Sequence, residues 1–215
     1  IGYGYMGQIR QKSLEENKNA ELHLICESNP EIIDSNQKFN VTGDPQALNE
    51  SNVDAVFVCT PNNLIPEIAI KCLNEGKHVF CEKPPARTVD EIRKVIEIEK
   101  KHPQFKLKYG FNHRYHGSVK KVKEIIDKKQ FGDIINFRGV YGKSSIVPFT
   151  GQWRSMKKFS GGGILLDQGI HMLDMFRYFC GDFEEVKSFV SNKYWKQDVE
   201  DNAYAIMRDK EGRVA

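Results

Sequence analysis

The 215-residue chain has no apolar run approaching the roughly 18 residues of a membrane span, and no secretory signal peptide is visible. It also lacks internal repeats and low-complexity segments. Neither sign of charge dominates, because 32 Lys and Arg oppose 29 Asp and Glu for a net charge of +3. We therefore expect a globular protein with neither a membrane nor a nucleic acid as its partner.

Paired metal-binding or redox cysteines are also missing, because the five cysteines form no C-x-x-C motif. Several, such as Cys59 and Cys81, end apolar runs typical of buried strands. This usage indicates free thiols in a reducing, cytoplasmic setting. His113 and His116 form a His-x-x-His without further ligands, so we interpret them as surface or substrate-loop histidines and predict no metal.

The most informative motif is a complete G-x-G-x-x-G within the first seven residues, built on Gly2, Gly4 and Gly7 with Tyr5 and Met6 between them. Such glycines allow a tight turn, close approach of a pyrophosphate to backbone amides, and close packing of a helix on its strand. Only Ile1 precedes the turn, where a strand is needed. We therefore expect a chain truncated at its start, and equally at its end, where a strand is cut off.

Strand and helix patterns alternate regularly up to about residue 112. Expected strands are 21–26, 53–59, 78–81 and 105–111, and expected helices are 8–17, 30–39, 65–74 and 88–102, with a helical turn over 44–51. Thr88 and Glu91 have the spacing of a capping box. This alternation predicts an α/β Rossmann domain with a doubly wound parallel sheet over residues 1–112.

A different pattern follows over residues 113–215. We expect helices over 118–129 and 161–180, strands over 134–141, 186–191 and 203–207, and a long polar loop over 142–160. These elements predict an α+β domain with an open, mostly antiparallel sheet.

Glu27 ends the second expected strand, twenty residues after Gly7, and we expect its carboxylate to discriminate between NAD and NADP. A carboxylate there can accept hydrogen bonds from both ribose hydroxyls and would repel a 2′-phosphate, so NAD is favoured over NADP. The alternative is a surface residue at a strand end. Thr60-Pro61-Asn62 and Glu82-Lys83 also follow apolar strands, which places them at the ligand-binding carboxyl edge, although a proline after a strand is ordinarily only a breaker.

Asp167, His171 and Asp174 are spaced to share one face of the helix expected over 161–180. An imidazole can accept a hydroxyl proton during alcohol oxidation, and a carboxylate one turn away can orient it. A solvated helix face and an oriented structural histidine are the alternatives. The narrow polar stripe among apolar residues favours a cleft.

These motifs together resemble the Gfo/Idh/MocA family of oxidoreductases. The shared features are residues 2–7, 60–62, 82–84, 114, 153–154 and 161–163, with Asp167, Gly169 and His171. The resemblance implies hydride transfer between NAD and a secondary alcohol of a sugar, cyclitol or sugar nucleotide. It implies that Lys83 supports the reacting oxygen, that His171 is the general base, and that Asp167 binds or orients substrate.

The resemblance also implies that Arg114, Trp153 and Arg154 contribute to substrate binding, and that the open C-terminal sheet mediates a homo-oligomer. Trp153 alone is equally explained as a packing anchor. Many relatives carry a histidine where this chain has Ile65, which affects substrate details rather than hydride chemistry. Two alternatives stay open: a non-enzymatic NAD-binding regulator of the same fold, and an NAD-dependent glycosidase.

Overall fold

The computed structural model describes residues 1–35, 38–44, 46–47, 52–142 and 152–215. The chain divides into two compact units, Ile1–Gly110 and Phe111–Ala215. The boundary expected after residue 112 lies two residues further along the chain.

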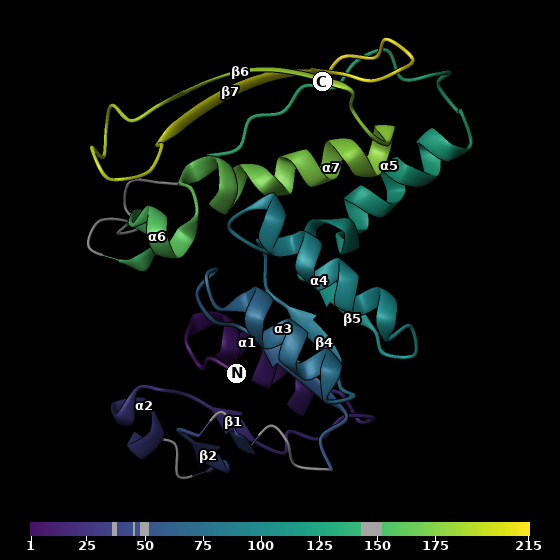
Figure 1. Cartoon of the computed structure of the whole chain (residues 1–215). Helices are drawn as coiled ribbons and strands as arrows, with labels where there is room; N and C mark the ends of the chain where they lie inside the picture. Colours follow the sequence, from purple (N-terminus) through teal and green to yellow (C-terminus); the bar gives the residue numbers. More distant parts are fainter. Residues whose placement is uncertain (36–37, 45, 48–51, 143–151) are drawn as a thin grey trace. The chain divides into compact units, whose positions relative to one another are not determined.

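The first unit alternates strand and helix (Figure 1). Its strands are β1 (Ile25–Cys26), β2 (Val41–Thr42), β3 (Ala55–Val58), β4 (His78–Cys81) and β5 (Leu107–Tyr109). Its helices are α1 (Tyr5–Glu15), α2 (Pro30–Ser35), α3 (Ile65–Asn74) and α4 (Val89–Lys101). All the strand pairs, β1 with β2, β3 with β4 and β4 with β5, are parallel.

Ile1 and Gly2 connect the two parallel ladders. The amino group of Ile1 donates to the Phe57 carbonyl at 2.7 Å, and the Cys59 amide donates to the Ile1 carbonyl at 2.8 Å. On the other side, the Gly2 amide donates to the Cys26 carbonyl at 2.9 Å. The first two residues thus lie between β1 and β3, and the parallel order β2, β1, residues 1–2, β3, β4, β5 confirms the doubly wound arrangement.

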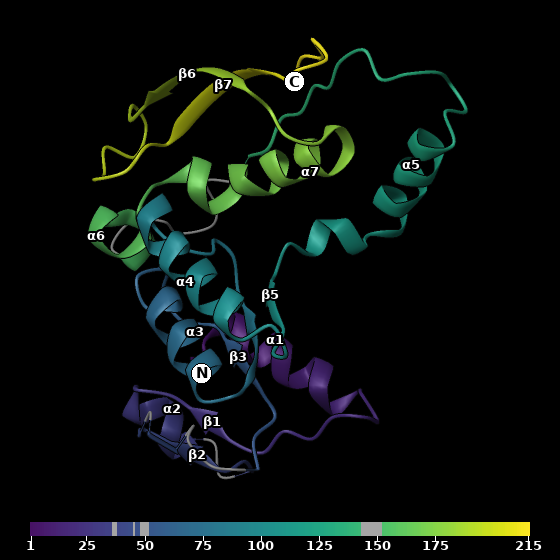
Figure 2. The same cartoon turned by 45° about the vertical axis from the view of Figure 1, so that its right-hand side comes forward.

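The core of this unit lies between the β3–β4–β5 sheet and α3, which packs beside α4 (Figure 2). Ile65 and Leu73 of α3 are fully buried against Val58 of β3. The predicted cap of α4 is present, because the Glu91 amide donates to Thr88 Oγ1 at 3.2 Å. The apolar run over 53–59 and the helical spacing over 65–74 thus predict the elements that carry the core.

Some expected elements are shorter. Of the strand expected over 21–26, only Ile25–Cys26 is paired in the ladder, with Val41–Thr42 of β2. The helix expected over 30–39 ends at Ser35 as α2, with residues 36–37 outside the described ranges. Most of the helical turn expected over 44–51 also lies outside them.

The second unit contains α5 (Gly117–Asp127), α6 (Lys157–Ser160), α7 (Ile170–Cys180) and the antiparallel strands β6 (Glu185–Ser191) and β7 (Asn202–Arg208). Single 3-10 turns cover Asn112–Tyr115 and Trp153–Ser155. Helix α7 runs along one side of the β6–β7 ribbon (Figures 1 and 2). The antiparallel sheet confirms the α+β class of this part.

Two predictions for the second unit were wrong. Residues 134–141 form no regular strand. They pair only through an isolated bridge between Asn136 and Val214, where the Phe137 amide donates to the Val214 carbonyl. Residues 152–160, expected as loop, contain a 3-10 turn and α6, whereas 143–151 lie outside the described residues.

The helix expected over 161–180 is also divided. Gly161, with a left-handed φ of 84°, ends α6, and a π-helical segment over Leu165–Gly169 precedes α7. The backbone at Gly163 lies so close to Glu200 that an added Cβ would be 1.9 Å from the Glu200 carbonyl oxygen. Glu200 caps the N-terminus of the helical segment that begins at Ile164. Its carbonyl accepts from the Ile164 amide at 2.9 Å, and its carboxylate accepts from the Leu165 amide at 3.2 Å.

Of the described helices, none is long and apolar enough to cross a membrane.

Candidate functional site

The glycine turn has the geometry that a dinucleotide site requires. Gly2 has a φ of +80°, and an added Cβ would lie 2.8 Å from the Cys59 carbonyl oxygen. At Gly7 an added Cβ would lie 2.3 Å from the Gly2 carbonyl oxygen, so only glycine lets α1 pack this closely on the turn. At Gly4 an added Cβ would meet nothing within 4 Å. The first and third glycines are therefore fixed by the fold, and the second leaves open space.

That open space lies at the N-terminus of α1. Gly4 is the N-cap residue, no side chain caps the helix, and its first turn contains no acidic residue. The first amides of an 11-residue helix thus lack a local side-chain acceptor, and the helix dipole favours an anion in front of them. Tyr5 is 80% exposed and Met6 is half-buried beside this end. The turn therefore fits the pyrophosphate of a dinucleotide.

Glu27, directly after β1, is held against the glycine turn. Its Oε2 accepts from the Tyr3 amide at 2.6 Å, and its Oε1 accepts from the Ser28 and Asn29 amides at 2.7 and 3.0 Å. Burial raises the pKa of Glu27, but these backbone hydrogen bonds outweigh it and hold the pKa below its ordinary value of 4.5. The carboxylate is therefore charged at neutral pH and fixed beside the turn.

Two other predicted segments lie at the same carboxyl edge of the sheet. Thr60-Pro61-Asn62 follows β3, and the Thr60 amide nitrogen would be 3.1 Å from a Cβ added at Gly2. Asn62 is buried, and Thr60 Oγ1 is buried with no hydrogen-bond partner in the described part of the chain. Lys83, half-buried, follows β4. The fold thus brings the segments after residue 2, β1, β3 and β4 to one edge, as the motif positions predict.

Glu82 has a partner that the sequence pattern did not reveal. Its Oε1 accepts from Arg10 Nε at 2.8 Å and Nη2 at 2.5 Å, so it ties α1 to the end of β4. Arg10 also lies over the Phe80 ring, 4.7 Å from its centroid. A Cβ at Gly110 would be 2.9 Å from Glu82 Oε2. Glu82 thus holds α1 to the end of β4 through Arg10. Its contact with a cofactor stays a prediction.

In the second unit, three predicted substrate residues lie together. Arg154 Nε is 3.8 Å from Asp167 Oδ1, and the Arg154 guanidinium lies 4.3 Å from the centroid of the Trp153 ring. The other carboxylate oxygen of Asp167 accepts from Gln168 Nε2 at 3.0 Å. Asp167 lies in the π-helical segment, a distortion that is frequent at functional sites.

His171 lies in the first turn of α7 and is buried in an aromatic cluster. Its ring stacks on that of His113, with centroids 4.2 Å apart and planes 19° from parallel. Phe111 contacts it edge-on at 6.3 Å, and the Tyr141 ring lies 6.1 Å away. His113 is half-buried here, so the expectation of a surface position holds only for the exposed His116.

Asp174 forms an ion pair with Arg114. Nε and Nη2 of Arg114 donate to its two carboxylate oxygens at 2.8 and 2.5 Å, and this bond raises the pKa of Arg114 above its ordinary value. The guanidinium also lies over the Tyr178 ring. Arg114 therefore ties the segment before α5 to α7, and its expected contact with substrate stays a prediction.

The remaining expectations concern metal, thiols and Ile65. Within the described ranges no group of three or more His, Cys, Asp or Glu side chains could hold a metal ion. All five cysteines are free, and burial raises the pKa of Cys59 and Cys72 to about 11. Ile65 is fully buried in the core of the first unit.

Both parts of the chain match profiles of known families. Residues 1–111 match an oxidoreductase family described as having an NAD-binding Rossmann fold, and residues 119–215 match the GFO/IDH/MocA C-terminal domain.

Similar proteins include levoglucosan dehydrogenase of Pseudarthrobacter phenanthrenivorans, 34% identical over 78% of this chain and 45% of that protein. Myo-inositol 2-dehydrogenase of Thermotoga maritima is 31% identical over 100% of this chain and 65% of its own length. A structure of levoglucosan dehydrogenase in complex with NADH superposes with a TM-score of 0.91 at 30% identity, covering 100% of this chain and 63% of that one.

The chain thus spans about half to two thirds of the length of these relatives. The two matched segments together account for most of its own residues and include the glycine turn, the strand-end segments and the region of Asp167 and His171. The resemblance inferred from the motifs is confirmed: the chain belongs to the Gfo/Idh/MocA family of oxidoreductases.

Proposed function

We propose that the chain carries the cofactor-binding and substrate-binding parts of an NAD-dependent dehydrogenase that acts on a secondary alcohol of a sugar, cyclitol or sugar nucleotide. The observation that carries the proposal is the carboxyl edge of the parallel sheet. There the uncapped start of α1 follows residues 1–2, the charged Glu27 follows β1, and the segment containing Lys83 follows β4. The similar levoglucosan and myo-inositol dehydrogenases support the substrate class.

We favour NAD over NADP because of Glu27. Its carboxylate is held by three backbone amides and lies where the adenosine ribose would bind. A 2′-phosphate there would meet a fixed negative charge, and Ser28-Asn29-Pro30 offers no cation to offset it. We expect kcat/KM for NAD to exceed that for NADP by about a hundredfold.

Residues 2–7 and Glu27 would hold NAD, whose nicotinamide would supply the hydride acceptor for oxidation of the alcohol carbon. His171 accepts the hydroxyl proton, and its burial and stacking fix the imidazole in one orientation. The ammonium of Lys83 hydrogen-bonds the reacting oxygen and stabilises the negative charge that develops on it. Asp167, beside Arg154, binds substrate hydroxyls, and the indole of Trp153 provides an apolar surface for the sugar ring.

The experiment incubates the full-length protein with NAD and a panel of sugars, cyclitols and sugar nucleotides, and follows the absorbance of reduced nicotinamide. Lys83→Ala and His171→Ala should each lower kcat by about a hundredfold or more while the Kd for NAD stays within about twofold. NAD binding without any reduction across the panel would instead favour a regulator. Full activity of the double variant would exclude these catalytic roles.

We also propose a homo-oligomer formed through one face of the β6–β7 sheet. Strand alternation places Phe189, Tyr204 and Ile206 on the same face, where they are 82%, 73% and 65% exposed. Met207, on the opposite face, is buried. Sedimentation should show a dimer or larger species, and Phe189→Glu with Ile206→Glu should convert it to monomer, because the charges cannot be buried in the contact.

The compartment we propose is the cytoplasm, because five thiols without a disulfide suit a reducing environment.

A further inference from the structure

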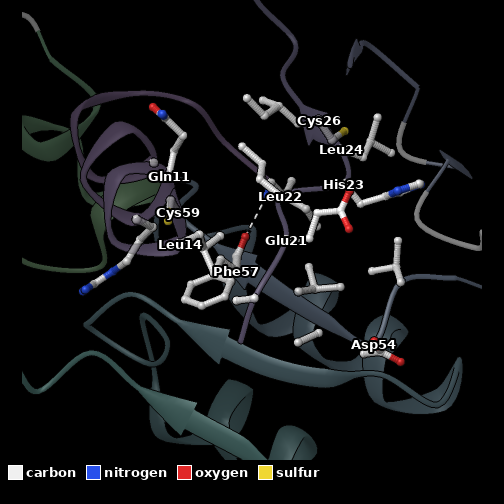
Figure 3. Close-up of a pocket in the computed structure, with 18 of the residues that line it drawn as sticks. Gln11, Leu14, Glu21, Leu22, His23, Leu24, Cys26, Asp54, Phe57 and Cys59 are labelled. Carbon is white, nitrogen blue, oxygen red and sulfur yellow. Dashed lines mark hydrogen bonds between the residues drawn. The ribbon is translucent and has the colours of Figure 1, made fainter. Parts of the chain in front are cut away.

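Helix α1 packs on one face of the β3–β4 ladder through aromatic contacts. Phe57 and Phe80 are partners in this ladder, with ring centroids 5.2 Å apart, on the face opposite to the core residue Val58. Figure 3 shows Leu14 of α1 beside Phe57, where both line a pocket. Arg10, one helical turn before Leu14, lies over the Phe80 ring, 4.7 Å from its centroid. Arg10 therefore contacts β4 directly.

The same guanidinium binds the carboxylate of Glu82, which lies two residues after Phe80. Nε and Nη2 of Arg10 donate to Glu82 Oε1 at 2.8 and 2.5 Å. The two side chains are only 19% and 9% exposed, so little water competes for these hydrogen bonds. Because side chains alternate along an extended chain, Phe80 and Glu82 face the same side, and one residue of α1 reaches both. Arg10 thus holds the end of β4 as well as the strand itself.

Glu82 is fixed through its backbone and through both carboxylate oxygens. The ladder pairs of β4 end at Cys81, and the Glu82 amide donates to the Val58 carbonyl at 2.9 Å. Its Oε2 lies against Gly110, where an added Cβ would be 2.9 Å from that oxygen. Its Oε1 accepts from Arg10. The carboxylate therefore extends the hold on the chain beyond the last ladder pair.

Lys83 is the next residue, and its proposed role depends on accurate placement. The ammonium ends a flexible four-carbon chain, so the backbone from which it extends decides which positions it can reach. A shift of about 1 Å in a positioned group can cost about a hundredfold in rate. The other end of the tie is itself fixed, because α1 packs on the glycine turn at Gly7 without room for a Cβ. Arg10 thus connects the backbone before Lys83 to a rigid helix.

We propose that Arg10 is a positioning residue for Lys83. By holding Glu82 against α1, it fixes the backbone from which the lysine side chain extends, and so places the ammonium relative to a cofactor bound at the glycine turn. This inference rests on the role proposed for Lys83 in hydride transfer. A purely structural tie is the alternative, and it would stabilise the first unit without affecting turnover.

Substitutions of Arg10 in the full-length protein separate these two roles. We measure the Tm, and then kcat, KM for the alcohol and the Kd for NAD well below the Tm. Arg10→Gln should lower kcat by about tenfold while the Kd for NAD stays within about twofold. Arg10→Lys keeps the charge but loses the forked contact, so it should lower kcat by only about threefold. The control is Arg93→Gln, because Arg93 pairs with Asp90 on the exposed side of α4, and it should leave kcat unchanged.

Two further measurements test whether the effect acts through Lys83. In a Lys83→Ala background, Arg10→Gln should lower the residual kcat by less than about twofold, because the group that it positions is already gone. Hydrogen exchange reports the backbone independently of turnover. Arg10→Gln should speed exchange of the Glu82 amide by about tenfold, whereas the Val79 amide, which donates to the Lys106 carbonyl, should exchange at its original rate.

Several results would overturn the proposal. A lower Tm with unchanged kcat in Arg10→Gln would show a structural tie only, and a weaker affinity for NAD with unchanged kcat would show support of the glycine turn instead. An equal loss of kcat with and without Lys83 would show that Arg10 acts independently of the lysine. If the unchanged protein reduces no NAD with any alcohol, the proposed function fails. Exchange at Glu82 then still decides whether Arg10 fixes the backbone before Lys83, and an unchanged rate there would exclude it.

Discussion

The imidazole of His113 stacks on that of His171, with ring centroids 4.2 Å apart and planes 19° from parallel. His171 is the proposed general base. The His113 ring also packs against the Tyr141 ring, with centroids 5.6 Å apart. The stack fixes the plane of the His171 ring, which decides where its nitrogens point. We therefore predict that His113 positions His171 for the proposed proton transfer.

Replacing His113 should affect turnover more than binding. We expect His113→Ala to lower kcat by about tenfold with little change in KM, because the His171 ring loses the surface that orients it. His113→Phe keeps an aromatic ring in the stack and should restore most of kcat. The measurement is steady-state kinetics of both variants. An equal loss in the two would show that His113 acts through its nitrogens rather than by stacking.

The glycine turn offers a matched pair of substitutions. Gly7→Ala places a Cβ 2.3 Å from the Gly2 carbonyl oxygen, so we expect it to lower the free energy of unfolding by about 3 kcal/mol. Gly4→Ala meets no atom within 4 Å and should leave the Tm almost unchanged. Because its methyl group occupies the space before α1, it should still weaken NAD binding by about tenfold or more. Unchanged NAD affinity in Gly4→Ala would place the pyrophosphate elsewhere.

Much of the first unit could be predicted because its signals are local. The glycine turn, the Thr88 cap and the apolar faces of α3 lie within short segments, where spacing alone decides the geometry. Arg10 and Glu82 pair across 72 residues, and Glu200 caps the helix start at Leu165 across 35. No periodicity connects such residues, so only the folded chain shows these contacts.

The helix expected over 161–180 illustrates the same limit. Its apolar spacing predicted a helix correctly for α7, but the spacing could not show that Gly163 packs against the Glu200 backbone. That contact delays the helix to Ile164, and the π-helical turn at Asp167 follows. Tertiary packing thus changed the geometry of a residue whose importance the sequence had indicated.

Glu27 should make stability depend on pH in acid. Its pKa is lower in the folded chain than the ordinary 4.5, so its stabilising contribution is fully present above pH 4.5 and is lost as the pH falls through the lowered value. Glu27→Gln removes this titration, so its Tm should fall less steeply with acidification below pH 4.5 than that of the unchanged chain. Parallel Tm curves for the two chains would contradict the assignment.

The same variant tests cofactor choice. Because Glu27→Gln removes the negative charge, we expect it to lower kcat/KM for NAD by about tenfold. The ratio of kcat/KM for NAD to that for NADP should fall as well. Glu31→Gln, a change of the same type at an exposed position in the first turn of α2, is the control and should leave the preference intact. If Glu27→Gln keeps the full preference for NAD, the acid does not contact the ribose.

Substitutions of Arg114 and Asp174 distinguish a structural role of Arg114 from a role in substrate binding. Its two hydrogen bonds to Asp174 predict that Arg114→Gln leaves a largely buried carboxylate without its partner, which should cost about 2–3 kcal/mol of unfolding free energy. Asp174→Asn removes the ion pair from the other side. Denaturant unfolding and KM should be measured for both variants. A structural role predicts similar KM values in the two, whereas a rise in KM confined to Arg114→Gln would establish contact with substrate.

Glu200 should control the start of the helix that carries the proposed catalytic residues. Its carboxylate accepts from the Leu165 amide at 3.2 Å, whereas its backbone carbonyl accepts from Ile164 independently of the side chain. Glu200→Ala should therefore cost about 1 kcal/mol, the effect of losing one cap, and Glu200→Gln, which keeps an acceptor oxygen, about half as much. Because Asp167 lies in the adjacent π-helical turn, Glu200→Ala should also raise KM for substrate while leaving the Kd for NAD unchanged. An unaltered KM together with the expected loss of stability would show that the turn keeps its geometry without this cap.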